Sequence, residues 1–170
     1  MKAHPDDTRP QIPDVGEGKR GEAGHIGYLL RQAGAAHRIR MEQALSAAGI
    51  TLPQYSLLTM LRAYPGVYGA DLARLTLLTP QTVCVIVGNL ERDGLVTRSG
   101  HPEHGRIRRL DLTEQGRACL ERCRPEVDAI ERAMLDGLPP QDEAAVRRWL
   151  VSMAKASSAI DDPVRAHEHG

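Results

Sequence analysis

Apolar side chains recur at intervals of three and four residues in six stretches of the chain, which is the period of one face of an α-helix. These stretches cover residues 24–48, 51–64, 69–78, 80–92, 114–135 and 141–160. Between the fourth and fifth, residues 95–98 predict a strand, 99–105 a loop and 107–112 a returning strand of alternating polarity, and 67–69 could add a short third strand. The pattern predicts a mainly α fold, with a winged helix-turn-helix between long N- and C-terminal helices.

The stretch from Gly69 to Thr113 organises the rest of the chain. Its first short helix is expected to bury Leu72, Ala73 and Leu75. Thr79 then stands at an N-cap position with Pro80 at the first helical position, and Asp93-Gly94 ends the second helix. One face of that second helix is apolar (Val83, Ile86, Val87, Leu90), so another set of side chains is expected to look outward or sideways: Gln81, Thr82, Cys84, Val85 and Asn89.

The hairpin that follows is basic. Four arginines (Arg98, Arg106, Arg108, Arg109) stand against one acid, Glu103, with His101 and His104 beside them. An exposed polar helix start next to a basic hairpin suits DNA, because the helix can enter a major groove while an arginine reaches the minor groove or phosphates. The predicted DNA contacts are Thr79, Gln81, Thr82, Cys84, Val85, Asn89, Arg98, His101, Arg106 and Arg108. The alternative for Arg98 and Arg108 is that they merely solvate a strand.

Composition narrows the class of protein. The formal net charge is zero and the isoelectric point about 7.1, which argues against a nonspecific nucleic-acid coat. Acidic residues gather between Glu126 and Glu143, away from the basic hairpin. We expect a cytoplasmic protein without a membrane segment, because no apolar run approaches the ~20 residues of a transmembrane helix. Three cysteines argue against a disulfide framework.

The chain divides into five predicted segments. Residues 1–21 read as a flexible arm without defined contacts, 22–50 as a dimerisation helix and 51–113 as the DNA-binding lobe. Residues 114–160 read as C-terminal dimerisation helices, with a kink near Arg122 caused by Pro125, and 161–170 as a flexible tail. The first helix and the last two helices together carry more apolar surface than one small lobe covers, which argues for a homodimer.

Several of these residues match a known family. The motifs Asp71-Leu72-Ala73, Thr82-Val83, the run from Leu90 to Val96, Arg106, and the run from Leu112 to Gly116 resemble the MarR family of bacterial transcriptional regulators. That resemblance implies a homodimer on a pseudopalindromic operator, most often a repressor, released by a small phenolic ligand or by thiol oxidation. It also implies a minor-groove role for Arg106. One departure is His104, where the family usually has an Asp that orients this arginine.

Other candidate sites follow from single residues. A ligand pocket could be lined by Tyr28, His37, Tyr55 and Tyr64, although Tyr55 and Tyr64 are more typical of a core. The alternative function is a thiol-oxidation sensor acting through Cys84 or Cys119, while Cys123 is expected to be buried and inert. A helical protein-interaction module with a vestigial winged lobe is a further alternative. The sequence predicts no metal site, cofactor or catalytic constellation, so we expect no enzyme.

Overall fold

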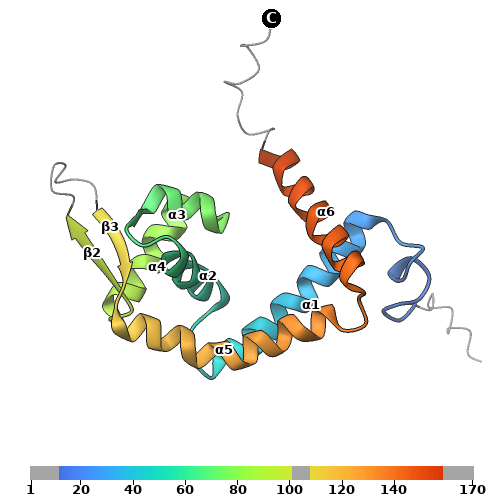
Figure 1. Cartoon of the computed structure of the whole chain (residues 1–170), viewed down its shortest axis with the longest axis horizontal. Coiled ribbons are helices and arrows are strands. Elements are labelled where there is room, and N and C mark those ends of the chain that lie inside the picture. The colour runs from blue at the N-terminus through green and yellow to red at the C-terminus, as the bar shows by residue number, and fades with distance from the viewer. Residues whose placement is uncertain (1–11, 101–107, 159–170) are drawn as a thin grey trace, which may run out of the picture. The chain divides into compact units, whose positions relative to one another are not determined.

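The computed structural model describes residues 12–100 and 108–158, and these ranges confirm the predicted fold class. The elements are η1 (Gly18–Arg20), α1 (Ile26–Ser46), α2 (Leu52–Ala63), β1 (Val67–Tyr68), α3 (Gly69–Thr76), α4 (Pro80–Arg92), β2 (Val96–Gly100), β3 (Arg108–Leu112), α5 (Glu114–Leu135) and α6 (Pro140–Ser158) (Figure 1). The chain forms two compact units, Met1–Val127 and Asp128–Gly170.

The segment before α1 contains defined contacts from residue 12 onward. Arg20 donates from Nη1 to the Pro13 carbonyl oxygen at 2.9 Å and from Nε to Gln32 Oε1 of α1 at 3.4 Å. Gly21 and Gly24 are both tightly enclosed, since an added Cβ would overlap the carbonyl oxygens of Gly16 and Lys19 respectively. The expectation of an arm without contacts is therefore wrong for this part of it.

The winged lobe is built on apolar faces of three helices. A reciprocal capping box between Thr51 and Gln54 begins α2, which buries Leu57, Leu58 and Leu61. Helix α3 buries Leu72 and Ala73, and α4 buries Val83, Val87 and Leu90. Two details differ from prediction: Leu75 is exposed and Ile86 is half-buried. The apolar face of α4 is therefore narrower than its sequence suggested.

The wing is a three-stranded antiparallel sheet in the order β1-β3-β2. Val67 pairs with Leu110, so the predicted short third strand is confirmed. Arg98 pairs with Leu110 and Gly100 with Arg108, which extends β2 two residues into the predicted loop. Because side chains alternate across a sheet, Arg98 and Arg108 share the face of the buried Val96, Leu110 and Leu112.

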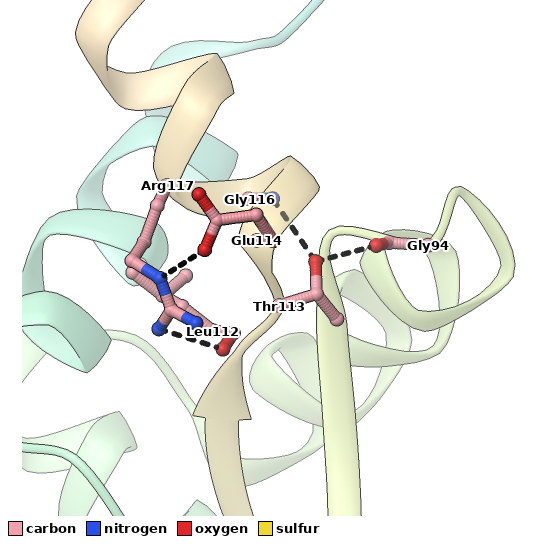
Figure 2. Close-up of polar contacts among 6 residues, drawn as sticks. All are labelled: Gly94, Leu112, Thr113, Glu114, Gly116 and Arg117. Carbon is pink, nitrogen blue, oxygen red and sulfur yellow. Dashed lines mark hydrogen bonds and ion pairs between the residues drawn. The ribbon is translucent and has the colours of Figure 1, made fainter.

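The base of the wing is joined to α5 by polar contacts drawn in Figure 2. Thr113 Oγ1 donates to the Gly94 carbonyl oxygen at 2.7 Å and accepts from the Gly116 amide at 3.0 Å, which caps α5 as predicted. Arg117 bonds the Leu112 carbonyl oxygen at 3.1 Å and Glu114 at 3.2 Å. Gly116 is buried where an added Cβ would overlap the Leu95 carbonyl oxygen. The hairpin and the first turn of α5 therefore form one rigid junction.

Helix α5 runs unbroken through Pro125, so the prediction of one helix rather than two is confirmed, while a kink near Arg122 stays a prediction. Its buried face within the first unit comprises Gly116, Cys119, Leu120, Cys123 and Val127. In the described part of the chain, no single helix is both long and apolar enough to cross a membrane. Helices α3 and α4 meet that criterion when taken together, across a bend of 107°.

Candidate nucleic-acid interface

The start of α4 presents an exposed polar surface. Thr79 Oγ1 accepts a hydrogen bond from the Thr82 amide at 3.1 Å, and the two hydroxyls lie 2.8 Å apart. This cap begins the helix at Pro80, and the first two turns bury Val83 while leaving several other side chains in solvent. The exposed set is Thr79, Gln81, Thr82, Cys84 and Val85, as the sequence predicted. Amide and hydroxyl groups at a helix start are suited to base edges and phosphates.

Asn89, a predicted DNA contact on the same helix, is already bonded within the protein. It is half-buried, and its Oδ1 accepts a hydrogen bond from Arg92 Nη2 at 2.8 Å. This bond engages the side-chain oxygen one turn before the helix ends. Asn89 is therefore less available than the exposed side chains at the helix start.

Two wing arginines face α4 across a shallow hollow. Its volume is about 250 Å³, and its walls come from Arg98, Arg108 and Leu110 of the wing, Pro80, Val83, Cys84 and Val87 of α4, and Gly69. Strand alternation therefore directs both arginines toward the helix that the sequence assigned to DNA. This placement favours an interface role over simple solvation of a strand. His101 and Arg106 lie outside the described residues.

Sequence reasoning missed Glu91 as part of this region. Arg98 Nε lies 3.0 Å from Glu91 Oε2, which links β2 to the last turn of α4. Glu91 follows Val87 by four residues and so continues the helix face that lines the hollow. That spacing was the sequence signal that could have placed Glu91 beside the hollow. Its pairing with Arg98 could be identified only from the register of the sheet.

The predicted pocket residues lie on α1 and α2, apart from Tyr64. The guanidinium of Arg31 stacks over the Tyr28 ring at 5.4 Å, and His37 Nδ1 is buried with no hydrogen-bond partner among the described residues. Tyr55 is half-buried. The prediction of a core position for Tyr64 is wrong, because its side chain is 52% exposed where α2 ends before Pro65-Gly66.

The three cysteines have contrasting environments. Cys84 is exposed, whereas Cys119 and Cys123 are 1% and 2% exposed on α5. The pKa of the Cys123 thiol is raised to about 11, mainly by burial and to a smaller extent by the neighbouring Cys119. The prediction that Cys123 is inert is consistent with this environment. The burial of Cys119 does not favour it as an oxidation site, because reactive thiols are usually accessible to solvent.

Thiol labelling should separate these environments. At pH 8 in native buffer, we expect an aromatic disulfide reagent to modify Cys84 quickly and the other two cysteines at least tenfold more slowly, because burial shields their sulfur atoms from the reagent. In denaturant all three should react at similar rates. A Cys84→Ser variant that still shows one fast thiol would contradict the assignment.

A polar helix start beside a basic, helix-facing wing defines a winged helix-turn-helix DNA-binding regulator. Residues 48–107 match the model of the MarR family. The HTH-type transcriptional repressor Rv2887 of Mycobacterium tuberculosis (strain ATCC 25618 / H37Rv) is 36% identical over 125 residues, covering 74% of this chain and 90% of that protein. The chain belongs to the MarR family of transcriptional regulators, which are not enzymes.

Solved structures agree with this assignment. BpsR of Bordetella bronchiseptica, whose DNA binding is regulated by 6-hydroxynicotinic acid, has a TM-score of 0.71 at 26% identity over 78% of this chain and 95% of its own. The repressor CouR bound to a 23-mer DNA duplex has a TM-score of 0.71 and 26% sequence identity, covering 76% of this chain and 92% of its own. Rv2887 in complex with p-aminosalicylic acid has a TM-score of 0.61 and 33% sequence identity, covering 77% of this chain and 99% of its own.

Proposed function

We propose that this regulator represses transcription in the cytoplasm as a homodimer on a pseudopalindromic operator, and that a small aromatic acid releases it. One observation carries the DNA-binding assignment: the exposed first turns of α4 lie beside a wing whose Arg98 and Arg108 face that helix. In this arrangement Gln81 and Thr82 read base edges, while Arg108 binds phosphates or the minor groove. Arg106 continues the wing in sequence and is proposed as its minor-groove residue.

The proposed dimer is supported by uncovered apolar side chains on the first and last helices. On α1 they are Ile26, Leu30 and Ile39; on α6 they are Val146, Trp149, Leu150, Val151 and Met153. A water-soluble monomer would leave this surface in solvent at a free-energy cost of about 25 cal/mol per Å². A two-fold dimer also places two recognition helices at successive major grooves.

The proposed effector-binding side chains come from α1 and α2. Tyr28 and Tyr55 offer aromatic surfaces, Arg31 a cation for a carboxylate, and His37 Nδ1 a polar atom without a partner among the described residues. The ligands named for BpsR and Rv2887 are both aromatic acids. A ligand that prefers the released conformation shifts the protein away from DNA, and its effect equals its differential affinity for the two states.

Fluorescence anisotropy tests this function directly. Duplexes that tile the DNA flanking the protein's own gene are titrated at several salt concentrations against scrambled competitor. We expect nanomolar, competitor-resistant binding of one duplex by a dimer, and weaker binding when salicylate or 6-hydroxynicotinate is added at millimolar concentration. Equal affinity for all duplexes, including duplexes selected from random DNA, would overturn the proposed function.

Two substitutions separate affinity from base preference. Arg106→Ala should weaken binding of every duplex and lower the slope of log affinity against log salt by about 1, because one phosphate or minor-groove cation is lost. Gln81→Ala should instead relax preference at one base pair by about 1–3 kcal/mol with little change in the salt slope. Both are measured by anisotropy on single-base-pair variants of the bound duplex. An Arg106→Ala protein that binds like wild type would contradict the wing assignment.

A further inference from the structure

The ion pair between Glu91 and Arg98 connects the two parts of the proposed DNA-binding surface. Glu91 stands on the last turn of α4, and Arg98 on the second strand of the wing. The pair is partly shielded, with the Arg98 side chain 31% exposed and that of Glu91 43% exposed. It joins two consecutive elements, α4 and β2, unlike the intrahelical i,i+3 and i,i+4 pairs of Arg74, Arg117 and Arg147.

The geometry of the pair leaves Arg98 neutralised but incompletely bonded. Its Nε lies 3.0 Å from Glu91 Oε2, yet no acceptor among the described residues lies in line with the Nε–H. The interaction is therefore mainly one of charge. Arg108 lines the same hollow as Arg98, so Glu91 also offsets the repulsion between two cations on one small surface.

We propose that Glu91 is a specificity-determining residue for DNA that acts through Arg98. Nonspecific binding depends on cationic side chains that can contact phosphates and displace the counterions of DNA. The carboxylate of Glu91 makes Arg98 less available for such a contact. Operator binding relies in addition on base contacts from the start of α4, which need the wing held at a set distance from that helix. Glu91 thus lowers affinity for random DNA while keeping the two reading elements in register. This inference rests on the proposed function.

The test compares wild type with Glu91→Gln, which removes the charge and keeps the size of the side chain. On a scrambled duplex, we expect affinity to rise about three- to tenfold and the salt slope to steepen by about 0.9, the value for one additional phosphate contact. On the preferred duplex the gain should be smaller, so discrimination between the two duplexes falls. Glu91→Asp, which keeps the charge, should restore most of the discrimination.

Two controls isolate the role of the pair. In an Arg98→Gln background, Glu91→Gln should leave the affinity for the scrambled duplex unchanged, because the cation that it releases is absent. Glu143→Gln removes an acid of the same type from an ion pair on α6, where Arg147 Nε lies 2.7 Å from its carboxylate. That variant has the same change in net charge and should not alter discrimination. Thermal unfolding of each variant verifies that it is folded.

The outcomes are distinguishable. If wild type discriminates between duplexes and Glu91→Gln discriminates equally well, the role of Glu91 is overturned and the proposed function stands. An equal effect of Glu91→Gln with and without Arg98 overturns the claim that it acts through this arginine. If wild type prefers no duplex, the proposed function itself is overturned, together with the inference that depends on it.

Discussion

Gly116→Ala should be the most destabilising conservative substitution at the junction of the wing and α5. An alanine Cβ would overlap the Leu95 carbonyl oxygen and lie 3.2 Å from Leu112 Cδ2, and the first of these is backbone that a rotamer change cannot move. The hairpin base must then separate from the first turn of α5. We expect a loss of about 3 kcal/mol in the free energy of unfolding, or a Tm lower by about 6–12 °C.

Gly88→Ala is the matched control for that experiment. Gly88 lies inside α4, and nothing stands within 4 Å of the Cβ that alanine would add. Removing a glycine from a helix interior should stabilise the protein by roughly 0.5–1 kcal/mol. Differential scanning calorimetry of both variants measures the effect. If Gly116→Ala unfolds at the same temperature as wild type, the close contact between α5 and Leu95 is not present in solution.

Arg108→Glu should cause the largest loss of DNA affinity among single substitutions in the described wing. The change replaces a cation that faces α4 with an anion, so it removes one phosphate partner and repels another phosphate. We expect affinity to fall by about tenfold or more near 0.1 M salt, with a shallower salt slope. Anisotropy titrations with the preferred duplex and the scrambled duplex give both quantities.

Its neighbour provides a control of identical charge. Arg109 occupies the next position of β3, pairs in register with Tyr68 of β1, and points to the opposite face of the sheet. Arg109→Glu alters the net charge by the same amount, yet it should reduce affinity several-fold less. Equal losses for the two variants would show that overall charge, not placement beside α4, governs the wing's contribution.

Much of this architecture was predictable because local signals agreed with one another. Thr79-Pro80 and Thr113 are strong helix starts, and Gly94 adopts a positive φ of 71° where α4 was expected to end. The alternation around Leu110 and Leu112 identified the core-facing side of β3. These signals act within a few residues, so a sequence pattern records them directly.

Other features depend on contacts between residues of different helices and strands. The pairing of Glu91 with Arg98 and the enclosure of Gly116 by Leu95 arise from the sheet register and from the packing of α5. Local reasoning also failed at the turn between α3 and α4. There Leu77, 92% exposed, adopts a left-handed φ of 55° that usually favours glycine or asparagine. Tyr64 was likewise misjudged, since its aromatic character suggested burial while its place at the helix end exposes it.

The junction around Thr113 has a consequence for how such proteins diversify. The Gly94, Thr113 and Gly116 contacts hold the two ends of the hairpin at a defined separation, whatever the length of chain between them. Insertions or exchanges between Gly100 and Arg108 therefore leave the scaffold unaltered, whereas a single inserted residue between Leu112 and Gly116 misaligns the helix that follows. Substitutions in the loop of the wing can therefore change DNA preference without changing the fold of the rest of the lobe.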